Sequence, residues 1–208
     1  MPQNGYLDVT ISLKKVKYEV IFEPLEGQTE CGDQYLIKEG ADFILLAVVD
    51  GLGHGKEAAF AAKKAIQTLV DNASESIETL FKLCDQALLN TRGAAMTVGK
   101  IDTRYKLTYM AVGNVIGLCW KIDTNNRMIQ HSLFLEGGIV GSRLPPAMEV
   151  KEIDMTPGDT VILATDGIKP EVEIEPPQLG SPEKIARQIF NIYRNKNDDG
   201  LILVAQLL

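Results

Sequence analysis

The longest apolar stretch of the chain covers residues 43–49 and ends at Asp50-Gly51. A continuous apolar run of this length is typical of a strand buried on both faces, so the sequence predicts a central strand here. Apolar residues then recur every three or four positions through residues 56–71 and again through residues 75–90. This spacing predicts two consecutive helices, each with one buried face.

After residue 94 the pattern changes to short apolar runs separated by Gly, Asn, Asp and Pro, which predicts strands. These strands are expected at residues 96–101, 106–112, 115–122 and 159–165. A third helix is predicted at 182–193, a last strand at 201–205, and loops at 140–146 and 170–182. Two helices in succession, followed by a series of strands, indicate an α+β layered fold instead of a regular βαβ alternation.

The length of 208 residues and the mass of 22.8 kDa predict a single domain over residues 1–208. Hydrophobic residues make up 45% and charged residues 24%, which are ordinary values for a globular protein. The run at 43–49 is much shorter than the roughly 20 apolar residues that cross a membrane. Residues 1–15 lack the apolar segment of a signal peptide. We therefore expect a cytoplasmic protein that does not bind membranes.

The charge balance bears on possible partners. The chain carries 21 Lys and Arg against 28 Asp and Glu, a net charge of -7. Binding to a phosphate backbone requires clustered cations, so we expect no nucleic-acid partner. Cys31, Cys84 and Cys119 are far apart and contain no Cys-x-x-Cys pair, which disfavours both a disulfide framework and a zinc ribbon. We expect reduced thiols in the core.

Acidic residues stand beside glycine where apolar runs begin or end. The pairs are Gly32-Asp33, Asp50-Gly51, Asp166-Gly167 and Asp198-Asp199-Gly200. A single Asp-Gly pair is most simply a tight turn. Several pairs at strand ends can instead converge at one edge of a sheet. Two carboxylates ~4 Å apart repel by about 4 kcal/mol at an effective dielectric constant near 20, so convergence would require cations.

The available ligands indicate which cations these would be. Carboxylate oxygens favour Mg²⁺ or Mn²⁺, and His54 and His131 are the only histidines, so a nitrogen-rich zinc site is disfavoured. The glycines of residues 51–55 also suggest a phosphate loop at a helix N-terminus. Their spacing matches neither a P-loop, in which Ser or Thr follows the lysine, nor the dinucleotide fingerprint, whose third glycine is replaced by Lys56.

Taken together and in order, these motifs resemble those of metal-dependent type 2C (PPM) serine/threonine phosphatases, in their compact SpoIIE-like bacterial branch. The matching segments, which span nearly the whole chain, are Cys31-Gly32-Asp33, residues 50–55, Arg92-Gly93-Ala94, Val112-Gly113-Asn114-Val115, Thr165-Asp166-Gly167 and Asp198-Asp199. The resemblance implies a four-layer αββα sandwich with two central antiparallel sheets flanked by helices. It also implies hydrolysis of phosphoserine or phosphothreonine on proteins, here phosphorylated STAS-domain proteins of the stressosome type.

The resemblance assigns ligands for two divalent cations, Mn²⁺ or Mg²⁺. Asp50 would bridge both cations, and the carbonyl of Gly51 would bind one of them. Asp166 and Asp198 would hold the other cation. Two cations held in this way lower the pKa of a bridging water, which can attack phosphorus in line while the cations take up charge on the phosphoryl oxygens.

Further roles follow from the same resemblance. Asp33 would act through a metal-bound water and completes the metal ligands, whereas Asp199 would be a neighbour and not a ligand. Asp33, Asp50 and Asp166 are therefore the predicted catalytic carboxylates. No phosphoenzyme is needed.

The chain departs from the family pattern at two positions. Many relatives have a histidine two residues after the bridging aspartate, a candidate acid for the leaving oxygen, but this chain has Leu52 there. His54 could take that role, or it could cap the helix or face solvent. The family's phosphate-binding arginine near the N-terminus is also missing. Arg92 is the predicted substrate-binding substitute, and the other candidates are Lys14, Lys15 and Lys17, although a solvated surface cation is an alternative for each. We expect His131 to be structural.

Two other functions fit the sequence. The first is a non-catalytic phosphoprotein-binding module that keeps the fold. Such a module would have lost a metal-binding residue, whereas Asp50, Asp166 and Asp198 are all present. A phosphohydrolase acting on a small molecule is the second alternative. Only the loops at 140–146 and 170–182 can frame the site, so selectivity is expected to come from docking a folded partner.

Overall fold

The computed structural model describes residues 16–123, 127–169 and 180–208, and these residues form two five-stranded antiparallel sheets and three helices. The first sheet contains, in spatial order, β1 (Val16–Glu23), β10 (Gly200–Leu207), β9 (Thr160–Ala164), β6 (Ile116–Ile122) and β7 (Met128–Ser132). The second contains β2 (Asp33–Glu39), β3 (Phe43–Gly51), β4 (Ala94–Asp102), β5 (Lys106–Val112) and β8 (Lys151–Asp154). The helices are α1 (Gly55–Asp71), α2 (Ile77–Leu88) and α3 (Pro182–Tyr193).

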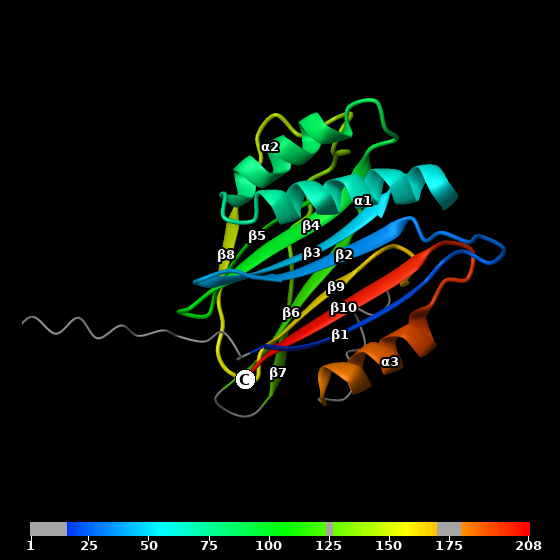
Figure 1. The fold of residues 1–208 in the computed structure, drawn as a ribbon. Helices are drawn as coiled ribbons and strands as arrows, with labels where there is room; N and C mark the ends of the chain where they lie inside the picture. Colours follow the sequence, from blue (N-terminus) through cyan, green and yellow to red (C-terminus); the bar gives the residue numbers. More distant parts are fainter. Residues whose placement is uncertain (1–15, 124–126, 170–179) are drawn as a thin grey trace, which may run out of the picture.

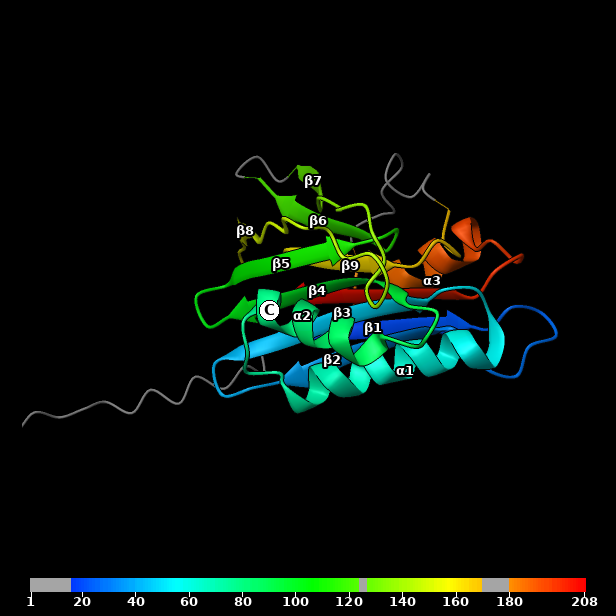
Figure 2. The ribbon, with the colours of Figure 1, turned by 90° about the horizontal axis from the view of Figure 1, so that it is seen from above.

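The sheets and helices form four layers (Figure 1). Helix α1 covers β2 and β3, and α2 covers β4 and β5, so both lie on the outer face of the second sheet. Figure 2 shows this pair of helices from above, lying across the second sheet. Helix α3 packs on β1 and β10, on the outer face of the first sheet. The predicted αββα sandwich is confirmed.

Apolar side chains fill all three spaces between the layers. One cluster lies between the second sheet and helices α1 and α2, one between the two sheets, and one beneath α3. Strand β3 belongs to two of them, because Leu45, Ala47 and Val49 face the helices and Ile44, Leu46 and Val48 face the other sheet. This double burial explains why the strand is continuously apolar.

Every helix and strand predicted from the pattern is present, with ends shifted by no more than two residues. Four strands were not predicted: β1, β2, β7 and β8. These are the edge strands of the two sheets. Each has exposed or partly exposed residues along most of its length, which mixes polar with apolar side chains and hides the strand pattern. The prediction of one domain over residues 1–208 extends beyond the described ranges and stays a prediction.

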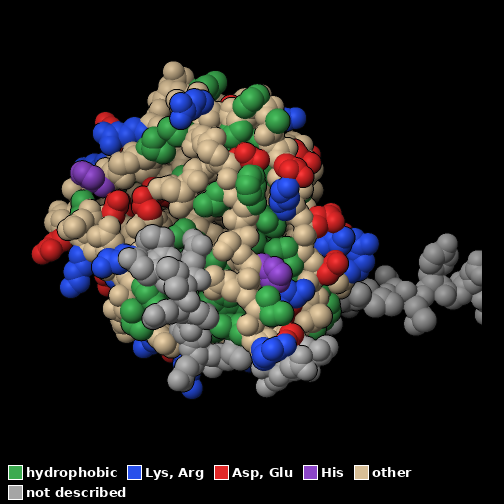
Figure 3. Space-filling view, turned by 180° about the vertical axis from the view of Figure 1, so that it is seen from behind, with side chains coloured by type: hydrophobic (Ala, Val, Ile, Leu, Met, Phe, Trp, Pro, Cys, Tyr) green, Lys and Arg blue, Asp and Glu red, His purple; other side chains and the backbone are tan. Residues whose placement is uncertain are grey.

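The three cysteines are free and buried, as expected. Burial raises the pKa of the Cys84 and Cys119 thiols to about 12. On the face of the molecule shown in Figure 3, Lys and Arg side chains lie among acidic and hydrophobic ones. Within the described ranges, no helix combines the length and hydropathy that crossing a membrane requires.

Candidate metal centre

The strand ends that carry the predicted carboxylates lie at one end of the sandwich, the end where helix α1 begins (Figure 1). Strand β2 starts at Asp33, and β3 ends at Asp50-Gly51. Strand β9 ends just before Thr165-Asp166, and β10 starts just after Asp199. Side chains alternate along a strand, and the neighbours at two-residue spacing face the space between the sheets. Asp33, Asp50 and Thr165 therefore point toward that space.

Asp33 and Asp50 form the buried part of this group. They are direct partners in the antiparallel pairing of β2 with β3. Asp33 is 2% exposed, and the hydroxyl of Thr165, on the opposite sheet, donates a hydrogen bond of 2.7 Å to its Oδ2. The Thr165 hydroxyl also accepts a hydrogen bond from the amide of Leu201, which fixes its orientation. This contact ties the two sheets together at the candidate site.

Asp50, Asp166 and Asp198 line a cavity of about 220 Å³ that opens at the same end. The side-chain amide of Asn114 lines it as well and donates a hydrogen bond of 2.6 Å to Asp166 Oδ2. The remaining lining residues are Leu52, Gly53, His54 and Asn197. Three of the predicted metal-binding carboxylates thus share one cavity, and Asp33 pairs with one of them from the neighbouring strand.

Asp199 is held differently from its neighbour Asp198. Its Oδ1 accepts a hydrogen bond of 2.8 Å from the amide of Leu25, and its Oδ2 accepts one of 2.9 Å from the amide of Gly32. Asp199 is buried and is not among the cavity residues. Both oxygens are engaged by the backbone of the β1–β2 connection, which supports the prediction that Asp199 is a neighbour and not a ligand.

The close acidic groups change one another's ionisation. Burial, followed by the neighbouring Asp33, Asp166 and Asp198 charges, raises the pKa of Asp50 to about 9. Burial also raises the pKa of Asp33 to about 7, although the Thr165 hydrogen bond opposes the shift. The pKa of Asp166 is raised as well, first by burial and then by Asp198. Near neutral pH, ionisation of all these groups at once is therefore unfavourable, and added positive charge would favour it.

The donor set suits a hard divalent cation. The carboxylates supply oxygen ligands, which Mg²⁺ and Mn²⁺ prefer, and the mutual repulsion gives a cation a direct energetic advantage. Within the described ranges, no three His, Cys, Asp or Glu side chains are grouped closely enough to hold a metal ion as they stand. Binding would therefore draw the aspartate side chains together. The residues present fit the predicted centre, and the ligand roles of Asp33, Asp50, Gly51, Asp166 and Asp198 stay predictions.

Glycines allow the backbone around the cavity to pack closely. A Cβ on Gly51 would lie 2.1 Å from the carbonyl oxygen of Ala58, so only glycine lets α1 approach the end of β3. The amide of Gly51 donates a hydrogen bond to the carbonyl of Gly32, and the amide of Leu52 donates one to the carbonyl of Gly93. The loop after β3 is thereby fastened both to the start of β2 and to the segment before β4.

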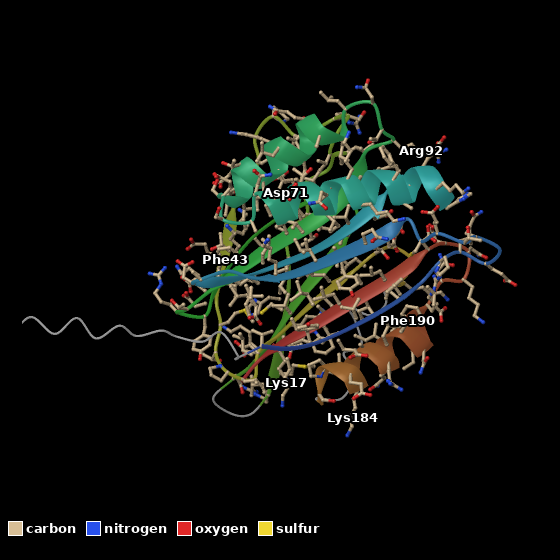
Figure 4. The ribbon with its side chains drawn as sticks, viewed as in Figure 1. Lys17, Phe43, Asp71, Arg92, Lys184 and Phe190 are labelled. Atoms are coloured by element: carbon tan, nitrogen blue, oxygen red, sulfur yellow. The ribbon has the colours of Figure 1, made fainter. Side chains whose placement is uncertain are left out.

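Arg92 lies at the rim of this cavity. A Cβ on the cavity residue Gly53 would lie 2.6 Å from Arg92 Nη1, so the guanidinium covers that glycine. Arg92 also forms an ion pair of 2.5 Å with Glu57. Figure 4 shows Arg92 near the start of α1 and Lys17 at the opposite end of the molecule. Lys17 is therefore too distant to bind the substrate phosphate, whereas Lys14 and Lys15 lie outside the described residues.

The two histidines differ in position. His54 is the residue before α1, makes no capping hydrogen bond with its side chain, is exposed and lines the cavity. Of the two alternatives to an acid role, His54 faces solvent and its side chain does not cap the helix; the acid role stays a prediction. His131 lies on the edge strand β7, opposite Cys119, and is exposed. It lines a separate hollow and is not among the residues of the carboxylate cavity, so the expectation that it is structural stays a prediction.

Sequence reasoning gave no role to three residues that organise this end of the sandwich. Thr165 and Asn114 belong to quoted motifs and bind Asp33 and Asp166, but a hydroxyl and an amide carry no signal of their own. Arg194 was not singled out, although its guanidinium contacts the carbonyls of Gly167 and Asp198, next to two predicted ligands. Only the three-dimensional structure reveals these contacts.

The chain is similar to known proteins over most of its length. The family model described as stage II sporulation protein E (SpoIIE) matches residues 41–206. Phosphoserine phosphatase RsbX of Bacillus subtilis (strain 168) is 31% identical over 193 residues, which covers 88% of this chain and 90% of that protein.

Solved structures show the same fold. A crystal structure of RsbX in complex with magnesium superimposes with a TM-score of 0.83 at 25% identity, over 94% of this chain and 96% of that one. A chain from a study of the bacterial stressosome in secondary messenger signalling also has a TM-score of 0.83, at 28% identity, over 93% of this chain and 100% of that one. The PP2C domain of SpoIIE from Bacillus subtilis has a TM-score of 0.76 at 19% identity, over 93% of this chain and 63% of that one, and shows the fold alone. The chain belongs to the SpoIIE family of PP2C-type phosphatases.

Proposed function

We propose that this protein is a metal-dependent phosphatase that removes phosphate from serine or threonine of STAS-domain signalling proteins of the stressosome type. The observation that carries the proposal is the set of carboxylates at one end of the sandwich, where Asp50, Asp166 and Asp198 line one cavity and Asp33 lies opposite Asp50. The similarity to phosphoserine phosphatase RsbX supports the reaction type, and the stressosome-related structure supports the substrate class.

The residues at this end of the sandwich would have two kinds of role, holding the metal ions and orienting the residues that hold them. Asp50, Asp166, Asp198 and the carbonyl of Gly51 would hold two Mg²⁺ or Mn²⁺ ions, while Asp33 would order water from the buried side. When bound, such ions lower the pKa of water and neutralise charge on phosphoryl oxygens. Thr165 orients Asp33, and Asn114 orients Asp166, each by one hydrogen bond.

The surroundings of Arg92 support a protein substrate. Arg92 lines a second hollow of about 350 Å³, together with Lys56, Glu57, Phe60, Asn90 and Thr91. Phe60 lines this hollow and is 59% exposed, so its ring is available to a partner. A folded partner could cover Phe60 while Arg92 binds the phosphate at the cavity rim. The loop at 140–146 is fixed next to this hollow. The amide of Gly141 donates a hydrogen bond to Asp85 near the end of α2, and Val140 pairs with Ala94, two residues after Arg92.

The test compares substrates on one enzyme. Phosphate release is measured from an intact phosphorylated STAS-domain protein, from a phosphopeptide of the same sequence and from nucleotides. We expect the highest kcat/KM for the intact protein and no hydrolysis of nucleotides. Equal kcat/KM for protein and peptide would contradict docking, and preference for a small phosphate ester would favour the small-molecule alternative. Binding of the phosphoprotein without any hydrolysis would favour a non-catalytic module.

A further inference from the structure

Arg194 is a buried cation whose hydrogen bonds go to backbone carbonyls. It follows the last residue of α3, and its side chain is 8% exposed. Its Nη1 donates a hydrogen bond of 3.3 Å to the carbonyl of Gly167, and its Nη2 donates one of 2.7 Å to the carbonyl of Asp198. A buried arginine is usually paired with a carboxylate. The nearest ion pair here is weak, because Glu23 Oε2 lies 4.0 Å from Nε and is well exposed.

The carbonyls that Arg194 binds belong to the two loops that carry predicted ligands. Gly167 directly follows Asp166, and the carbonyl of Asp198 belongs to a ligand itself. The guanidinium therefore bridges two chain segments that lie about 30 residues apart in the sequence. The backbone amide of Asn195 donates a hydrogen bond of 2.8 Å to the Gly167 carbonyl, which adds a second contact between the same loops.

The space around the guanidinium is shaped to hold it. A Cβ on Gly200 would lie 2.6 Å from Arg194 Cζ, so the absence of a side chain at this position makes room for the arginine. A Cβ on Gly167 would lie 1.8 Å from the carbonyl oxygen of Asp199, so the two ligand loops are in direct contact. The ring of Phe190, on α3 (Figure 4), lies 5.7 Å from Cζ and packs against the guanidinium.

We infer that Arg194 is a positioning residue that sets the separation of Asp166 and Asp198 for one divalent cation. This role rests on the proposed metal centre. Two carboxylates that share a cation must stay close although they repel each other when it is absent. An arginine bound to their carboxylates would compete with the cation. Because Arg194 binds carbonyls, it fixes the loops without occupying a carboxylate oxygen of Asp166 or Asp198. A planar guanidinium can bind several carbonyls at once, which a lysine ammonium cannot reproduce in the same geometry.

The experiment measures metal binding directly. Isothermal titration calorimetry of Mn²⁺ and of Mg²⁺ into the metal-free protein is carried out for the unaltered chain, for Arg194→Met and for Arg194→Lys. Arg187→Met serves as the matched control, because Arg187 lies on α3, the helix that Arg194 follows, and forms an exposed ion pair with Glu183. Residues that orient metal ligands typically contribute 10- to 100-fold to metal affinity. We expect at least a ~10-fold weaker affinity for Arg194→Met, a smaller loss for Arg194→Lys, and no change for Arg187→Met.

A second readout separates positioning from a general loss of structure. Phosphatase activity measured against metal concentration should show a half-maximal concentration raised by about 10-fold in Arg194→Met, with kcat recovering at saturating metal. Circular dichroism reports whether each variant is folded. If Arg194→Met does not fold, Arg194→Lys decides the question by the same titration. An affinity equal to that of the unaltered chain in the folded variant would overturn the role of Arg194. Absence of metal binding in the unaltered chain and in Arg187→Met would instead overturn the proposed centre, and this role with it.

Discussion

Asp33 and Asp50 lie directly opposite each other on the neighbouring strands β2 and β3, and both side chains face the space between the two sheets. A pair of carboxylates at this register is destabilising, because like charges directly across an antiparallel pair repel. The pair is best tolerated when one or both groups are protonated or when positive charge is added. The hydroxyl of Thr165 stabilises one oxygen of Asp33, but it leaves Asp50 without a comparable partner among the hydrogen bonds of the described residues.

The first prediction concerns Asp50, which would be shared by both cations. Asp50→Asn should lower metal-dependent hydrolysis of an aryl phosphate by more than ~100-fold, because the amide cannot supply the negative charge that both ions need. Steady-state kinetics with Mn²⁺ and with Mg²⁺ measure the effect. Glu39→Gln, at the far end of β2, is the control and should keep full activity. Near-normal turnover in Asp50→Asn would exclude a bridging role.

The second prediction concerns the pH dependence of stability in the metal-free protein. The ordinary pKa of 3.8 is raised to about 7 for Asp33 and to about 9 for Asp50 in the folded state. The folded protein therefore keeps these protons after the unfolded chain has released them. This contribution to the free energy of unfolding is fully present below about pH 4 and is lost as the pH rises through 7 and 9. Thermal unfolding between pH 5 and 9 in the presence of chelator should show a falling midpoint.

Two comparisons check the origin of that pH dependence. Asp50→Asn should unfold at a higher temperature than the unaltered chain at pH 8 without metal, by about 5 °C if roughly 2 kcal/mol of repulsion is removed. Saturating Mg²⁺ should flatten the pH dependence of the unaltered chain. A metal-free protein whose unfolding midpoint rises from pH 5 to pH 9 would contradict the acidic cluster as its cause.

The third prediction concerns Arg92 at the cavity rim. Arg92→Ala should lower kcat/KM on a phosphoprotein by about 10-fold, mainly through KM, since a hydrogen bond to a charged group contributes roughly 1.5–3 kcal/mol. Arg104→Ala is the matched control. Arg104 is also exposed and paired with an acid, Asp102, but it lies at the other end of the second sheet. The same loss in both variants would show a non-specific effect of charge and would remove Arg92 from substrate binding.

The fourth prediction concerns His54 at the cavity mouth. If His54 protonates the leaving oxygen, His54→Ala should reduce hydrolysis of a serine phosphate by ~10²-fold and of an aryl phosphate much less, because the aryl oxygen is the better leaving group. The ratio of the two rates in the same preparation is the quantity to measure. A small and equal loss on both substrates would mean that water supplies the proton.

The sequence predicts those helices and strands that have at least one continuously buried face. Strand β3 is apolar throughout because both of its faces are covered, and the helices show their spacing because one face of each is buried. The edge strands β1, β2, β7 and β8 carry no such signal, because solvent reaches them along most of their length. Strands β1 and β8 pair with strands that are distant in the sequence, β10 and β5, whereas β2 and β7 pair with β3 and β6, their neighbours along the chain.

The candidate site shows the same division. Asp33, Asp50, Asp166 and Asp198 could be found from the sequence, because acidic residues beside glycine recur at strand ends in the order of a known family. Thr165, Asn114 and Arg194 could not, since their roles depend on contacts between segments far apart in the chain. Among the candidates for the phosphate-binding cation, position in the fold separates Arg92 from Lys17, whereas Lys14 and Lys15 lie outside the described residues.

The most direct test of metal-dependent phosphoprotein hydrolysis uses a phosphorylated STAS-domain protein as substrate. Release of inorganic phosphate is measured after treatment of the enzyme with chelator, and again after addition of Mn²⁺ or Mg²⁺, with Asp50→Asn carried through the same steps. We predict that chelator abolishes release, that either ion restores it in the unaltered chain, and that neither restores it in Asp50→Asn. Full release in excess chelator, or equal release by Asp50→Asn, would contradict the account.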